Sequence, residues 1–435
     1  MSSFRLCAAL VFLAVVLGGG GTPAPWPELI LQLLFLAAAI LWVAFGRSGQ
    51  LARGRGILDV PVLAGVTFLL LLVGAQLIGL PPGLWSALPG REQVAATYGL
   101  FDAQSAWHPM TVAPGDTVAA ALSLIPPLLM LLFVAQLRLA DRTRLLAVLA
   151  GAALLSALLG ALQVAEGGSF LRLYAYTHVG FATGFHANRN AAADLFLVGI
   201  LAAITFAAAK RHSPVSGRWR LGALGAGAFL TLVVLLTGSR TGTVLLLPVF
   251  AVGAVLLAGR GRVSRRTLLG GSGVLLALAA LVMVNPMLRR TADRFFFEQD
   301  ARVDLWTDSY FAVEQTWPLG AGLGSFVPVF LTAERLEAVD PSYPNRAHND
   351  YLEFALEAGL PGLVLLAFVF GAVVWRVRKH LAAGGVVALH ATFAAMVITL
   401  FALHSIVDYP MRSMSLAVIA AMAIALLARE PVEDA

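Results

Sequence analysis

Twelve long runs of apolar residues decide what this chain can fold into. A helix needs roughly 20 apolar residues to cross about 30 Å of hydrocarbon. The runs lie at 4–20, 27–46, 58–80, 118–137, 145–165, 191–209, 221–237, 241–258, 268–284, 359–375, 386–404 and 413–428. Of 435 residues, 59% are hydrophobic and 12% charged, which is outside the range of soluble globular domains. The sequence predicts an all-α polytopic membrane protein with about 12 transmembrane helices.

Basic residues predict the orientation of these helices, because loops rich in Lys and Arg stay in the cytoplasm. Each even-numbered run from the second to the tenth is followed by such a loop: Arg47, Arg53 and Arg55; Arg138, Arg142 and Arg144; Lys210, Arg211, Arg218 and Arg220; Arg260, Arg262, Arg265 and Arg266; Arg376, Arg378 and Lys379. We therefore expect both termini in the cytoplasm and segments 81–117, 166–190 and 285–358 on the outer face. These loops also explain the net charge of +6, so a nucleic-acid partner gains no support.

The runs divide the chain into three parts. Residues 1–284 form an N-terminal block of nine helices, 285–358 a large outer loop, and 359–435 a C-terminal block of three helices. The first run has a basic start and an exit rich in Gly and Pro, so it resembles a signal peptide as well as a span. The single cysteine, Cys7, lies in this run and cannot form an internal disulfide.

The large outer loop contains one predicted helix and one glycine-rich turn. Hydrophobic residues recur at about helical spacing across 300–312 and just beyond, at Val303, Trp306, Tyr310 and Val313. Three alternate glycines follow, at 320, 322 and 324. A dinucleotide-binding turn needs a strand before it and a helix after it within a βαβ unit. No such unit is predicted, so the sequence argues against nucleotide binding.

Two arginines stand at outer ends of predicted spans, where the charge rule disfavours them. Arg189 precedes the run at 191–209, and Arg240 lies between Ser239 and Thr241 in the short turn before 241–258. Either could extend to lipid phosphates. A guanidinium beside two hydroxyls also suits a phosphate or pyrophosphate, so we interpret this turn as an anion clamp.

His348 is the candidate proton acceptor, because an unperturbed imidazole titrates near neutral pH. It precedes a predicted helix near Asn349, which it could instead cap. Asp350, Glu353 and Glu357 follow at helical offsets of three and four and share one face. They could orient the imidazole or simply solvate the helix. The residue types allow a metal site, but the spacing repeats no known ligand pattern.

A second histidine lies at the outer end of the eleventh run. His404 is followed four residues later by Asp408, and the two side chains could pair with each other or take part in chemistry. Arg412 lies nearby, while Arg289 and Arg290 begin the large loop. Each of these arginines could hold a lipid phosphate.

Several motifs together resemble one family. They are Gly238-Ser-Arg240, Trp317-Pro-Leu-Gly-Ala-Gly-Leu-Gly-Ser-Phe326, His348-Asn-Asp-Tyr-Leu352 and Glu357-Ala-Gly-Leu-Pro-Gly362. Over roughly 180–370 the chain resembles the O-antigen ligase and polysaccharide polymerase family of bacterial inner-membrane proteins.

The resemblance implies a metal-independent, inverting glycosyltransferase with no cofactor. It would transfer an undecaprenyl-pyrophosphate-linked glycan to a sugar hydroxyl, on a glycan or lipid A-core acceptor, at the periplasmic face of the inner membrane. In this interpretation His348 activates the acceptor and Arg240 binds the pyrophosphate. Other substrate contacts are expected at Arg189, Arg289, Arg290, Asn349, Asp350, Glu357, His404 and Arg412.

Three alternatives stay open. A repeat-unit polymerase of the same family would use the same donor. A lipid-linked glycan transporter would place polar or broken-helix sites near the middle of the bilayer, and the sixth to ninth runs contain little of that. A non-catalytic assembly partner would tolerate loss of His348 or Arg240.

Overall fold

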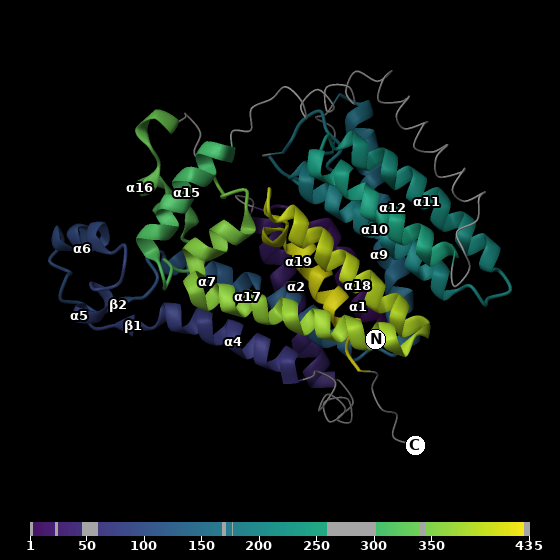
Figure 1. The fold of residues 1–435 in the computed structure, drawn as a ribbon, viewed down its shortest axis with the longest axis horizontal. Helices are drawn as coiled ribbons and strands as arrows, with labels where there is room; N and C mark the ends of the chain where they lie inside the picture. The colour runs from purple at the N-terminus through teal and green to yellow at the C-terminus, as the bar shows by residue number, and fades with distance from the viewer. Residues whose placement is uncertain are drawn as a thin grey trace.

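The computed structural model describes residues 3–21, 25–45, 60–167, 171–175, 177–258, 302–339 and 344–429, and it is almost entirely helical (Figure 1). The longer helices are α1 (Ser3–Leu17), α2 (Pro25–Phe45), α4 (Val60–Leu77), α7 (Pro114–Ser123), α8 (Ile125–Ala135), α9 (Leu139–Ala165), α10 (Arg189–Ala209), α11 (Ser216–Leu236), α12 (Arg240–Ala258), α15 (Arg302–Thr316), α17 (Asp350–Ala383), α18 (Gly385–His404) and α19 (Met414–Ala425). Short elements are β1 (Gly79–Leu80), α5 (Pro82–Trp85), α6 (Glu92–Gly99), β2 (His108–Pro109), α16 (Phe326–Ala333), η1 (Leu336–Ala338) and η2 (Pro410–Arg412).

This architecture confirms the predicted all-α polytopic membrane protein. In the part of the chain that the structure describes, nine helices are long and apolar enough to cross a membrane, with α7 and α8 together counted as one. The shorter α1 and α19 coincide with the first and last predicted spans. The ninth predicted span, 268–284, lies outside the described residues, so the total of about 12 stays a prediction.

Helix α10 is the centre of the bundle. Nearly all of its side chains are buried, as expected for a helix that is apolar on every side, and α9, α11, α12 and α18 pack around it (Figure 1). Glycines let α12 approach closely: a Cβ on Gly242 would lie 2.7 Å from that of Ala193, and one on Gly253 would lie 2.9 Å from Ile204. The two helices therefore run parallel and begin at the same end of the bundle.

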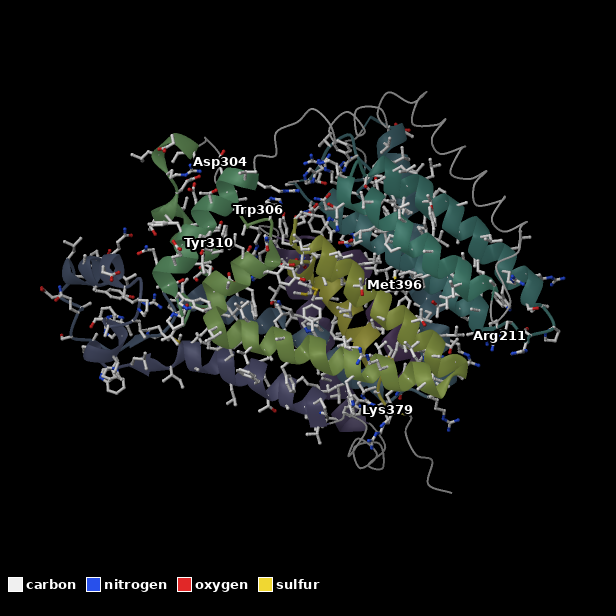
Figure 2. The ribbon with its side chains drawn as sticks, in the orientation of Figure 1. Arg211, Asp304, Trp306, Tyr310, Lys379 and Met396 are labelled. Atoms are coloured by element: carbon white, nitrogen blue, oxygen red, sulfur yellow. The ribbon has the colours of Figure 1, made fainter. Side chains whose placement is uncertain are left out.

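The segment that follows α4 and the segment that precedes α17 meet in a lobe at one end of the molecule, which contains α5, α6, α15 and α16 (Figure 1). β1 and β2 pair antiparallel, and Val112 donates its N–H to the carbonyl of Ala321 at 2.9 Å. The predicted helix over 300–312 is confirmed as α15. Of the residues that set its helical spacing, Val313 is buried, whereas Val303 and Tyr310 are exposed; Tyr310 and Trp306 are labelled on this helix in Figure 2.

The glycine-rich loop packs against a break in α17. Gly359 has φ 56°, so the regular helical bonds stop there. Leu360 donates its N–H to the carbonyl of Pro318 at 2.8 Å, and Gly322 donates to that of Glu357 at 2.9 Å. A Cβ on Gly359 or Gly320 would lie within 2.7 Å of facing backbone atoms. Segment 318–322 thus completes the backbone bonding of the broken helix, and the glycines at 320 and 359 permit the close approach.

The helix predicted to begin near Asn349 and the span predicted to begin at 359 are joined in α17 across a kink at Gly359. The span expected to begin at 359 belongs to α17, which begins at Asp350. The end of the predicted loop, 350–358, is therefore helical. The sequence signal at Gly359-Leu-Pro-Gly362 marks the break inside this helix, where neighbouring segments satisfy the freed backbone groups.

The opposite end of the bundle carries basic side chains. Arg211 and Lys379 lie far from α15 and α16 (Figure 2). Arg142 is buried there and donates to the carbonyls of Ala135 and Ala428, each at 2.6 Å. It therefore joins the ends of α8 and α19. The assignment of this end to the cytoplasm stays a prediction.

Candidate active site

His348 and Asp408 form a histidine–carboxylate pair at the lobe end of the bundle. His348 lies just before the N-cap of α17 and has φ 49°. Its Nδ1 is 3.0 Å from Oδ1 of Asp408, with side-chain exposures of 30% and 3%. If Nδ1 carries the proton that is donated to Asp408, Nε2 of the neutral ring keeps a lone pair. The outer nitrogen is then available as a proton acceptor.

Asp408 is held from two sides. The side-chain amide of Asn190, in the first turn of α10, donates to its Oδ2. Burial opposes ionisation of Asp408, but the hydrogen bond and charge of His348, with the charges of His404 and Arg302, lower its pKa to about 2. The carboxylate is therefore ionised at neutral pH and can stabilise a protonated imidazole.

Tyr409 forms a wall beside the imidazole. Its ring meets that of His348 nearly edge to face, with centroids 4.8 Å apart. The phenol hydrogen-bonds with Asn188 and Asn345, and burial raises its pKa to about 12. Tyr409 is thus a neutral group that joins the start of α10 to the loop before α17.

Arg189 and Arg240 are the first residues of the parallel helices α10 and α12. The Arg189 guanidinium lies 4.3 Å from the ring centroid of Phe181. Helix N-termini carry partial positive charge, so the two arginines add to a field that already favours anions. Asn190 places the His348–Asp408 pair at this same end of α10, so His348 and the two interfacial arginines lie at one end of the bundle.

Ser239, a predicted part of the clamp, caps α12. Its hydroxyl accepts the N–H of Gly242 at 3.1 Å, in the usual manner of a serine at a helix start, and the residue is buried. An accepting hydroxyl keeps its own O–H, so its role as a donor to an anion stays a prediction.

His404 has a different partner from the one predicted. Its Nδ1 is 2.8 Å from Oδ1 of Asp194, and both side chains are 1% exposed. Its predicted pairing with the Asp408 side chain is wrong, because Asp408 turns toward His348 and Asn190. A substrate contact at His404 is also contradicted, since bulk ligand cannot reach a fully covered ring.

A second charged cluster, here called the arginine cluster, consists of Asp350, Glu353, Glu357, Arg346 and Arg412. Nη2 of Arg412 is 2.7 Å from Oε2 of Glu357 and 3.2 Å from Oε1 of Glu353, and Arg346 is 2.8 Å from Glu353. Burial opposes the charge of Arg412, but the three carboxylates raise its pKa. These acids therefore neutralise arginines, which differs from both roles considered for them, orienting the imidazole and solvating the helix.

The cluster also binds backbone. Glu357 accepts the N–H of Gly324 at 2.9 Å, and Glu353 accepts that of Ala347 at 3.0 Å. Asp350 accepts from the Ser405 hydroxyl at 2.8 Å. In this structure Asp350 and Glu357 hold the end of α18 and the glycine-rich loop, while the substrate contacts expected at Asp350, Glu357 and Arg412 stay predictions.

Asn349 likewise has an internal role. Its side-chain oxygen accepts the N–H groups of Tyr351 at 3.1 Å and Leu352 at 3.0 Å. It is the N-cap of α17, a role that the sequence analysis offered to His348. Arg289 and Arg290 lie outside the described residues. Within those residues, no group of three or more His, Cys, Asp or Glu side chains could hold a metal ion.

Three contributors to the site were not predicted from the sequence: Asn190, Asp194 and Arg302. The pairing of Asp408 with His348 was not predicted either. Arg302, the first residue of α15, interacts electrostatically with Asp408 and His404. A usable signal was present. Asn190 and Asp194 are four residues apart on one apolar helix, and His404 and Asp408 are four apart near the end of another, so each pair shares a face.

Comparison with known proteins bears on this site. A family model described as O-antigen ligase matches residues 225–367. The matched segment contains Arg240, Arg302 and His348, and it ends before His404 and Asp408. No curated protein matches the chain. The family match confirms the resemblance inferred from the sequence motifs.

Proposed function

From the premise that this multi-pass membrane protein is similar to the O-antigen ligase family, we propose that it transfers a glycan from undecaprenyl pyrophosphate to a sugar hydroxyl. The observation that carries the proposal is the His348–Asp408 pair, 3.0 Å apart, with a buried carboxylate and a partly exposed imidazole. This arrangement suits removal of a proton from a hydroxyl, as in other histidine–aspartate pairs.

The proposed step forms one bond and breaks one. The acceptor oxygen attacks the anomeric carbon from the face opposite the carrier, and its proton passes to Nε2 of His348. The bond from the anomeric carbon to the pyrophosphate oxygen breaks, and its electron pair leaves with the undecaprenyl pyrophosphate. His348 then releases its proton to water, which its exposed edge permits.

Cationic groups would bind the leaving pyrophosphate. Arg240 and Arg189 begin the two parallel helices α12 and α10, where helix termini and guanidinium groups act together on an anion. Arg302 joins Arg289 and Arg290 as a further candidate, because its charge acts on Asp408. These preorganised cations would thus stabilise the negative charge that develops on the leaving pyrophosphate.

The membrane setting supports this assignment. The donor carries a polyprenyl chain, so its pyrophosphate must lie at the bilayer edge. In the charge-based orientation, the site end of the bundle faces the periplasm of a bacterial inner membrane. A transporter would need its polar site near the bilayer middle, whereas the His348–Asp408 pair lies beyond the end of α18.

The testing experiment is mass spectrometry of undecaprenyl-linked glycans extracted from cells that lack the protein. Long lipid-linked chains would support a ligase, and single repeat units would support a polymerase. An unchanged lipid-linked pool would overturn the proposal. Wild-type protein and a His212→Ala control, altered at an exposed histidine remote from the site, should restore the normal pool. His348→Ala at equal membrane abundance should not.

A further inference from the structure

Two paired contacts join α10 to the end of α18. Asn190 donates to Asp408, and one helical turn further in Asp194 meets His404 at 2.8 Å. The partners are four residues apart on both segments, so the contacts lie one above the other. Only the outer contact reaches His348.

The inner pair is costly to bury. Asp194 and His404 are each 1% exposed, and no hydrogen-bond partner is found for Oδ2 of Asp194 among the described residues. Apolar side chains of similar volume would pack at such a place without the desolvation penalty. Ionisable groups in that setting generally have a functional reason.

The backbone connects the inner pair to the outer one. The N–H of Asp408 donates to the carbonyl of His404 at 2.9 Å, and the N–H of Asp350 donates to that of Ser405, also at 2.9 Å. A change in the position of His404 would therefore move the segment that carries Asp408 and the helix start that follows His348. Besides Asp194 and Asp408, the charge of Arg302 acts on His404.

We propose that Asp194 and His404 are positioning residues that hold Asp408, and through it His348, in the geometry for proton transfer. The inference rests on the proposed function and deepens it. Neither side chain touches substrate, because both are buried. Their contribution should therefore appear in the rate of the chemical step and leave substrate affinity unchanged.

The test compares purified Asp194→Ala and Asp194→Asn proteins with wild type. The donor is the lipid-linked glycan extracted from cells lacking the protein, and membranes of those cells supply the acceptor. We expect Asp194→Ala to lower kcat on the order of 100-fold, as small misplacements can, with KM for the donor unchanged. Asp194→Asn keeps an oxygen for the Nδ1–H of His404 and should recover most of that loss.

A matched control comes from another buried contact on α18. The Thr143 hydroxyl is 3.0 Å from Nε2 of His390, and Thr143→Val should leave kcat near wild type. Thermal unfolding of each variant in detergent tests whether it is folded. An equal loss of kcat in Thr143→Val, or an Asp194→Asn protein that is folded yet as impaired as Asp194→Ala, would overturn the proposal.

A double variant separates positioning from an independent effect. In the Asp408→Asn background, Asp194→Ala should cause no further loss of kcat; the same 100-fold loss there would contradict the inference. Normal kcat in Asp194→Ala would also overturn it. If His348→Ala itself transfers glycan normally, the proposed function fails. If His348→Ala is inactive while Asp194→Ala is normal, only the positioning role fails.

Discussion

The His348–Asp408 pair and the arginine cluster lie at the same end of α17 but differ in exposure and charge balance. His348 is 30% exposed over a single buried carboxylate. In the arginine cluster, three acids surround two arginines, and Glu353 and Glu357 are fully buried. The imidazole of His348 is therefore partly open to solvent. The polar atoms of the arginine cluster bind other groups of the protein instead.

The difference shows that neighbouring acids in sequence can serve opposite purposes. A carboxylate bonded to guanidinium groups and backbone N–H groups is satisfied and fixed. A carboxylate bonded to a histidine that reaches the surface can support a change of protonation. Substitutions in the two regions should therefore separate activity from stability.

The largest expected effect is on activity. Asp408→Asn should lower kcat by about 1,000- to 10,000-fold, because an amide cannot hold the required tautomer or stabilise the imidazolium. Initial rates of transfer to membrane acceptors measure it, with unfolding temperature as the check on structure. Asp141→Asn, which removes a carboxylate paired with Arg144 at 2.9 Å, serves as control. Equal rates in the two variants would refute the role of Asp408.

The arginine cluster should show its effect in stability. Arg412→Met leaves buried carboxylates without their partner, and breaking such a pair commonly costs about 3–5 kcal/mol. The free energy of unfolding in detergent is the measurement. Arg144→Met, at a pair with an exposed arginine, should cost no more than about 1 kcal/mol. A fully stable Arg412→Met protein with lost donor affinity would support the predicted substrate contact.

These contrasts also show what the sequence could predict. Apolar runs, basic loops and the helix of α15 follow from composition and spacing, because membrane crossing and helical periodicity are local demands. The motif around His348 indicated the proposed base. Its partner could not be found in that motif, since Asp408 is 60 residues away and arrives only when α18 packs against α10.

The errors have a common physical origin. Glu353 and Glu357 share a helix face as predicted, yet what faces them is Arg412, brought by the turn after α18. Likewise, the i to i+4 spacing of His404 and Asp408 predicted a local pair, but Asp194 from α10 took the histidine. Spacing predicts which side chains point the same way, and tertiary packing decides what they meet.

A smaller loss of activity is expected at the cationic end of the site. Arg240→Gln should lower kcat about 100- to 1,000-fold, the usual effect of removing one donor to developing charge. Arg240→Lys should retain part of the wild-type activity, because it keeps one positive charge. Arg220→Gln, at an exposed position near the end of α12, is the control. Full activity in Arg240→Gln would exclude it from the pyrophosphate site.

The smallest effect is the pH dependence of stability that Asp408 contributes. The pKa of Asp408 falls from its ordinary 3.8 to about 2 in the folded protein. A group whose pKa is lowered by folding stabilises the fold above its unfolded pKa and loses that contribution as pH falls through the folded value. The contribution of Asp408 is about 2 kcal/mol, present at pH 5 and lost between about pH 4 and pH 2.

The difference in free energy of unfolding between wild type and Asp408→Asn isolates this contribution, because other acids titrate in both proteins. The difference should shrink by about 2 kcal/mol as the pH falls from 5 toward 2. A difference that stays constant down to pH 2 would mean that folding does not lower the pKa of Asp408. The two regions at the start of α17 would then differ in exposure alone.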